Sequence, residues 1–176
     1  LRLFSESGAG SYEVELSAVN SAVLEACEAG SPLALVNGSG NALGQLGLDS
    51  AMAPSCTPGA GDGGERVYLV EIGPDDGLPL LLTARVEGQV GGTLGDPAVS
   101  VRSNCQSALS EIGCSNGSVS AQDPLFPRMN PAITRVAIEE PGTYAIIVDG
   151  SSVGPRANFQ LDVETAPLAR APRNDS

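Results

Sequence analysis

Two segments in the last third of the chain alternate apolar and polar side chains. Within residues 141–150, Tyr144, Ile146 and Val148 occupy every second position, and residues 157–164 repeat the pattern after a polar loop. A period of two is typical of an antiparallel strand that buries one face. This pair of segments therefore predicts a chain built from strands.

Similar short segments are spread along the chain between turns. The 22 Gly and 13 Pro are dispersed rather than repeated, and both residue types mark turns. The best helical candidate, residues 21–27, is too short to be stable alone. We expect an all-β fold, an antiparallel jelly-roll-like β-sandwich of about eight strands. A closed barrel would have a similar local pattern, but the long and uneven loops favour the sandwich. The clearest expected strands are residues 12–16, 66–72, 80–86 (a central strand), 97–102, 133–138, 141–150 and 157–164, with a further apolar run at 32–36.

Three segments are expected along the chain. Residues 20–165 form the sandwich domain, and residues 166–176 form a proline-containing tail or linker. Residues 1–19 hold an extra strand, which ends a preceding unit or is donated to another copy. Leu1 is not a start methionine and no signal peptide is visible, so we expect a mature or excised fragment. The assembly residues of the extra strand are Tyr12, Val14 and Leu16.

The charged residues exclude several functions. The net charge is −12, all nine cations are Arg, and Lys and His are absent. An acidic chain repels nucleic acid and anionic membrane surfaces, and no apolar run is long enough for a transmembrane helix. Without His there is no Ser-His-Asp triad, Cys-His pair or His-Glu-x-x-His zinc site, and without Lys there is no Ser-Lys dyad. We therefore expect no enzyme, no required cofactor and no membrane insertion. A carboxylate-pair hydrolase remains a remote alternative, disfavoured because Trp is absent and aromatic residues make up 3% of the chain.

Four cysteines, Cys27, Cys56, Cys105 and Cys114, allow three disulfide pairings. A Cys105–Cys114 bridge would staple a hairpin, and Cys27–Cys56 would then close the glycine-rich N-terminal part. The alternative is a four-cysteine zinc site, but structural zinc sites use close pairs such as Cys-x2-Cys. Disulfides imply an oxidising compartment: the periplasm, the cell surface or the medium.

Acidic residues in or beside the expected loops are candidates for a calcium site. Calcium takes six to eight oxygen ligands, and loop carbonyls can add to carboxylates. The alternative is that these residues form turns and solubilise the surface. The candidate ligands are Asp62, Glu65, Asp75 and Asp76, and Asp96 and Asp149 have similar positions.

The order of several short motifs resembles one known family. The motifs are residues 25–29, Cys56 followed by residues 65–70, residues 96–105, Gly113-Cys114, and residues 142–150 followed by the strand at 158–164. Together they resemble the bacterial pre-peptidase C-terminal domain family. The resemblance implies a secreted, non-catalytic jelly-roll-like sandwich, usually appended to proteases or surface proteins and sometimes binding calcium. An acidic pair often follows the second loop cysteine in the family, whereas residues 115–117 here are Ser-Asn-Gly.

These observations favour two functions. The first is a non-catalytic extracellular module for surface display, adhesion or accessory binding, whose partner is a larger parent protein or a cell-surface component. The second is a subunit of an extracellular filament or polymer, assembled by strand donation between copies. We expect a secreted, extracellular or cell-surface location in either case.

Overall fold

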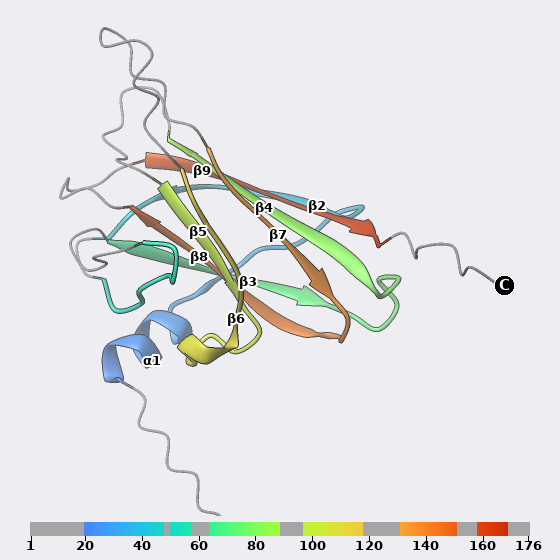
Figure 1. Ribbon diagram of the computed structural model, residues 1–176, viewed down its shortest axis with the longest axis horizontal. Helices are drawn as coiled ribbons and strands as arrows, with labels where there is room; N and C mark the ends of the chain where they lie inside the picture. The colour runs from blue at the N-terminus through green and yellow to red at the C-terminus, as the bar shows by residue number, and fades with distance from the viewer. Residues whose placement is uncertain are drawn as a thin grey trace, which may run out of the picture.

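The computed structural model describes residues 20–47, 50–57, 64–88, 97–117, 131–150 and 158–168, which form a β-sandwich with one α-helix (Figure 1). One sheet has the strand order β1-β3-β8-β5-β6, and the other has the order β2-β9-β4-β7. All pairings are antiparallel except that of β1 with β3. The all-β sandwich is confirmed, and β4 is central in its sheet as predicted. The bounds are α1 Ser21–Glu28, β1 Ser31–Pro32, β2 Ser39–Gln45, β3 Glu65–Ile72, β4 Leu80–Gly88, β5 Pro97–Arg102, η1 Ala108–Ser110 (a 3-10 turn), β6 Glu111–Asn116, β7 Ala132–Ile138, β8 Gly142–Gly150 and β9 Asn158–Pro167.

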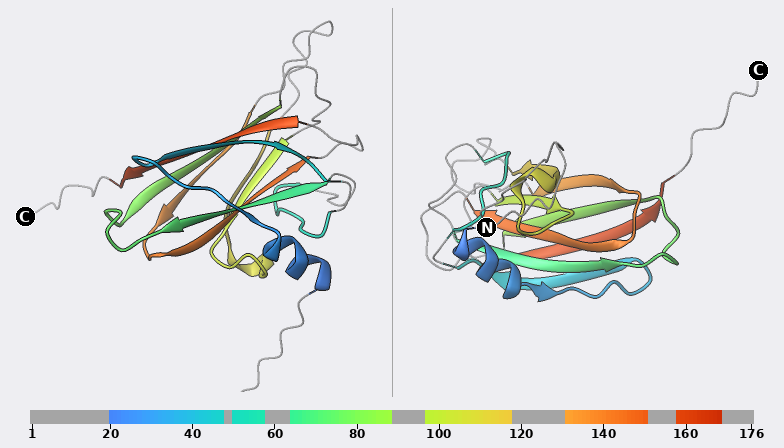
Figure 2. Two further views of the ribbon diagram at one scale, coloured as in Figure 1. Left: turned by 180° about the vertical axis from the view of Figure 1, so that it is seen from behind. Right: turned by 90° about the horizontal axis from the view of Figure 1, so that it is seen from below.

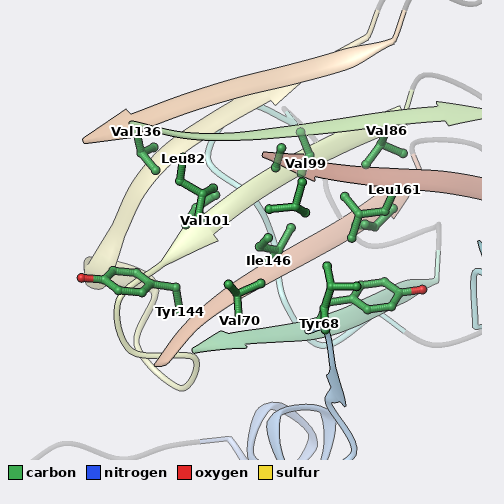
Figure 3. Close-up of a cluster of buried hydrophobic side chains, with 14 of the residues drawn as sticks. Tyr68, Val70, Leu82, Val86, Val99, Val101, Val136, Tyr144, Ile146 and Leu161 are labelled. Carbon is green, nitrogen blue, oxygen red and sulfur yellow. The ribbon is translucent and has the colours of Figure 1, made fainter. Parts of the chain in front are cut away.

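The main hydrophobic core lies between the two sheets. Figure 3 shows side chains from β3, β4, β5, β7, β8 and β9 pointing toward one another. Phe159, Leu161 and Val163 of β9 are completely buried, so the alternation read from the sequence is confirmed there. The Tyr68 and Phe159 rings meet edge to face, with their centroids 6.2 Å apart, an arrangement that aromatic pairs favour.

Strand β8 departs from the sequence expectation because both of its faces are buried. Its inner face joins the main core, whereas Ala145 and Ile147 on its outer face are at most 1% exposed. They pack with Cys27 of α1, Met52 and Val67 in a second cluster. The expectation of a half-buried strand was therefore wrong here, since a helix and a loop cover the outside of the five-stranded sheet.

The disulfides join different cysteines from those expected. The structure contains Cys27–Cys105 and Cys56–Cys114. A Cys105–Cys114 staple does not form because Cys114 lies farther along β6, where its register partner on β5 is Ser100. Cys105 instead meets α1, and Cys114 meets the loop that carries Cys56. Both bridges thus fasten covering segments to the five-stranded sheet.

Two strands were not expected from the sequence, β2 and β6. Strand β2 has a composition of low strand propensity, with two Gly and one Asn among its seven residues. It forms a strand because it pairs with β9. The turn before β2 was expected: Asn37 and Gly38 both have positive φ, 52° and 78°, as a tight two-residue hairpin turn requires. Pairing continues through this turn as a bridge between Val36 and Ser39.

The N-terminal predictions have mixed outcomes. The helical candidate at residues 21–27 is confirmed as α1, whose Asn20 cap accepts a hydrogen bond from the backbone N–H of Ala22 at 3.0 Å. Tyr12, Val14 and Leu16, proposed for assembly, lie outside the described residues. Within the described part of the chain, no helix has the length and apolar character needed to cross a membrane.

Candidate ligand-binding face

The outer faces of the two sheets differ. The outer face of the five-stranded sheet, here the covered face, lies beneath α1 and residues 50–57. The outer face of the four-stranded sheet, here the open face, carries no described helix or loop. In Figure 1, α1 lies beyond β3 and β8, on the other side of the molecule from β2, β9 and β4. Figure 2 shows the same arrangement from behind.

The open face is polar because its strands alternate. On β9 the inward side chains are buried, while Asp162 is half-buried and Glu164 is exposed. On β4 and β7 the outward positions include Arg85 and Arg135, both exposed, between inward residues that are buried. This alternation is expected of a sheet with one solvated face.

Strand register arranges these side chains into two rows across all four strands. A hollow of about 420 Å³ lies over them and is lined by both rows and the neighbouring backbone of Gly40 and Val163. The first row is Asn41, Asp162, Arg85 and Ile133. The second row is Ser39, Glu164, Thr83 and Arg135.

Some charged groups of the hollow are held by neighbours and others are free. The side-chain amide of Gln160 donates to both carboxylate oxygens of Asp162, at 2.9 and 3.1 Å, and Arg85 forms an ion pair with Glu87 on its own strand. The side chains of Arg135 and Glu164 form no hydrogen bond or ion pair with any residue in the described ranges. The hollow therefore combines oriented groups with groups available to a ligand.

The covered face also contains polar groups, but these fasten the loop above them. The Glu65 carboxylate accepts backbone N–H bonds from Ala51 at 3.0 Å and Met52 at 2.7 Å. Burial raises the pKa of Glu65, and the same hydrogen bonds partly oppose the rise. Arg102 is only 2% exposed and donates to the carbonyl of Ala53 at 3.3 Å. These contacts hold residues 51–53 against the sheet.

Asp149 lies directly opposite Glu65 in the pairing of β3 with β8. It is 3% exposed, and burial raises its pKa to about 7; the bond from the Gly150 N–H opposes this rise, and the charge of Glu65 adds to it. Two further polar atoms of this face, Ser100 Oγ and Arg102 Nε, are buried without a hydrogen-bond partner in the described structure. The covered face thus holds buried polar groups beside its apolar cluster.

Of the calcium candidates that the structure describes, Glu65 lies opposite Asp149 but apart from Asp75 and Asp76. Glu65 begins β3, which is about 23 Å long at 3.3 Å per residue, and Asp75 and Asp76 lie in the turn beyond its other end. Asp76 accepts a hydrogen bond from the Gly73 N–H within that turn, which agrees with the turn-forming alternative. Asp62 and Asp96 lie outside the described residues. Across the residues that are described, no three Asp, Glu, Cys or His side chains are grouped to hold a metal.

Sequence reasoning missed the residues of the open face. A signal was present, because Arg85 and Arg135 interrupt otherwise apolar strands at positions that must face outward. Sequence alone does not reveal, however, that β2 and β9 lie beside β4 and β7.

A scan against protein-family models finds no match for this chain, and a search of the curated proteins finds no significant relative.

Proposed function

We propose that this chain is a non-catalytic binding module that holds a polar ligand on its open face. The observation that carries the proposal is the hollow across all four strands, in which the side chains of Arg135 and Glu164 have no hydrogen-bond or ion-pair partner among the described residues. The covered face is less suited to this role, since its Glu65 and Arg102 side chains fasten residues 51–53.

The same geometry disfavours catalysis. A carboxylate-based hydrolase needs an acid whose proton is retained by burial. Asp162 is half-buried and Glu164 is exposed, so neither carboxylate of the hollow is sequestered from water. The buried carboxyl of Asp149 lies on the covered face, away from the hollow. Binding without turnover is the function that these positions support.

We place the module in an oxidising compartment, at the cell surface or in the medium. Two disulfides support this location, because disulfides persist where thiols are not continually reduced. The resemblance to pre-peptidase C-terminal domains supports the same assignment. Surface display, adhesion or accessory binding for a larger parent protein would all use such a module.

The experiment is a binding screen with a variant of the open face. Fluorescently labelled, oxidised protein is tested on immobilised polysaccharides, cell-envelope fractions and extracellular proteins. We expect one or more surfaces to capture the protein. The double variant Asn41→Ala with Arg135→Ala should weaken this capture at least tenfold. Arg66→Ala is the matched control, because Arg66 is exposed but lies outside the hollow. Capture that is insensitive to the open-face variant, or absent on every surface, would contradict the proposal.

A further inference from the structure

The charges that line the hollow cancel. Arg85 and Arg135 on β4 and β7 oppose Asp162 and Glu164 on β9. The whole chain, in contrast, carries a net charge of −12. A strongly anionic ligand would approach two carboxylates, and a strongly cationic ligand would approach two guanidinium groups. The lining therefore favours a ligand with many hydrogen-bonding groups and no net charge.

The remaining side chains are suited to hydroxyl groups. Carboxylates and the Asn41 amide oxygen accept hydrogen bonds, guanidinium and amide groups donate, and the hydroxyls of Ser39 and Thr83 do both. Arginine and carboxylate groups are planar forks that can bind two adjacent polar atoms together. Two adjacent sugar hydroxyls can donate two hydrogen bonds to a carboxylate or accept two from a guanidinium group, so they can bind either kind of fork.

The dimensions and the apolar contact point the same way. Four strands about 4.8 Å apart give the hollow a span of about 14 Å from β2 to β7, which suits a short oligosaccharide. Ile133 ends one row and is only partly buried. It can pack against the C–H face of a sugar ring, a contact that aromatic residues provide in many sugar sites. Gln160 orients Asp162 in advance, which lowers the entropy cost of binding.

We infer that the hollow binds an uncharged oligosaccharide of about two or three sugar units. This inference rests on the proposed function and adds the ligand class to it. Arg135 and Asp162 are the principal hydrogen-bonding residues, because the Arg135 side chain has no partner among the described residues and Gln160 already orients Asp162. Ile133 provides the apolar contact.

The test is calorimetric titration of the oxidised full chain with a panel of oligosaccharides. The uncharged probes are gluco-, manno-, galacto-, xylo- and N-acetylglucosamine trisaccharides, and the charged probes are oligogalacturonate and deacetylated glucosamine oligomers. We expect at least one uncharged probe to bind with an affinity that changes less than threefold between low and high salt. Arg135→Ala and Asp162→Ala should each weaken it at least tenfold, and Arg66→Ala should not.

The outcomes separate the ligand class from the proposed function. Binding of only a charged probe, weakened by Arg135→Ala or by salt, would overturn the inference about an uncharged ligand and leave the open face as the binding site. Binding of an uncharged probe that no variant of the hollow weakens would overturn both. Failure of every uncharged probe to bind would overturn the ligand class, and the screen on proteins and cell-envelope fractions would then decide the proposed function independently.

Discussion

The two outer faces of this sandwich differ in what covers them. On the five-stranded sheet, β5 is buried at every position and β8 from Tyr144 onward. On the four-stranded sheet, β7 and β9 alternate buried and accessible residues. The comparison shows that the burial of a strand depends on what packs against its two faces. A strand with a continuous apolar run is covered on both faces, whereas a strand with an alternating run leaves one face to water or a ligand.

The disulfides are the strongest test of how the covered face is held. Replacing Cys56 and Cys114 together by Ser should lower the free energy of unfolding by about 4 kcal/mol, because this bridge closes a long loop. Replacing Cys27 and Cys105 should cost a similar amount. Urea denaturation measures both. A loss below about 1 kcal/mol for either pair would mean that the cover is held without the bridges.

Matched truncations compare the two faces directly. Ile147→Ala removes a completely buried side chain from the covered face and should cost about 3 kcal/mol, because it leaves a cavity. Ile133→Ala, on the open face, should cost about 1 kcal/mol or less because Ile133 is already partly exposed. Denaturation midpoints and slopes report both values. Equal losses would show that the open face is as closely packed as the covered one.

The buried Asp149 predicts a pH dependence specific to the covered face. Its pKa is raised from 3.8 to about 7 in the folded protein, so the folded state binds the proton more tightly than the unfolded state. Its contribution to stability is complete below pH 4 and is lost as the pH rises through about 7. Between pH 5 and pH 8, the unfolding free energy of Asp149→Asn should therefore rise by about 2–3 kcal/mol relative to that of the native chain.

The matched control for this pH dependence is Asn41→Ala on the open face. It changes no ionisable group, so the pH profile of its unfolding free energy should run parallel to that of the native chain. Parallel profiles for the native chain and Asp149→Asn would contradict the assignment of the pH dependence to the covered face.

Much of the fold could be predicted from the sequence, because alternation and turn residues are local signals. The strand expected at residues 157–164 and the Asn37-Gly38 turn are examples. The disulfide pairing could not be predicted, because it depends on how far Cys114 lies along β6 and on where α1 packs. The burial of Ala145 and Ile147 was also missed, since the residues that cover them are distant in sequence.

The candidate site was less predictable than the fold. Its residues come from four strands whose order along the sheet follows from topology, so no local motif contains them. Asp162 and Asn41 become neighbours only through the register of β2 with β9. Acidic residues in loops predict a calcium site one residue at a time, but Glu65 begins β3 and Asp75 lies in the turn beyond its other end.

The most direct test of the difference between the two faces is a map of backbone amide chemical shifts. The oxidised full chain is titrated with the pooled uncharged trisaccharides, and shift changes are assigned by residue. Binding on the open face predicts changes concentrated on β2, β9, β4 and β7, with the largest near Arg135 and Asp162. Changes concentrated on α1, η1 and residues 50–57, or no changes at all, would contradict it.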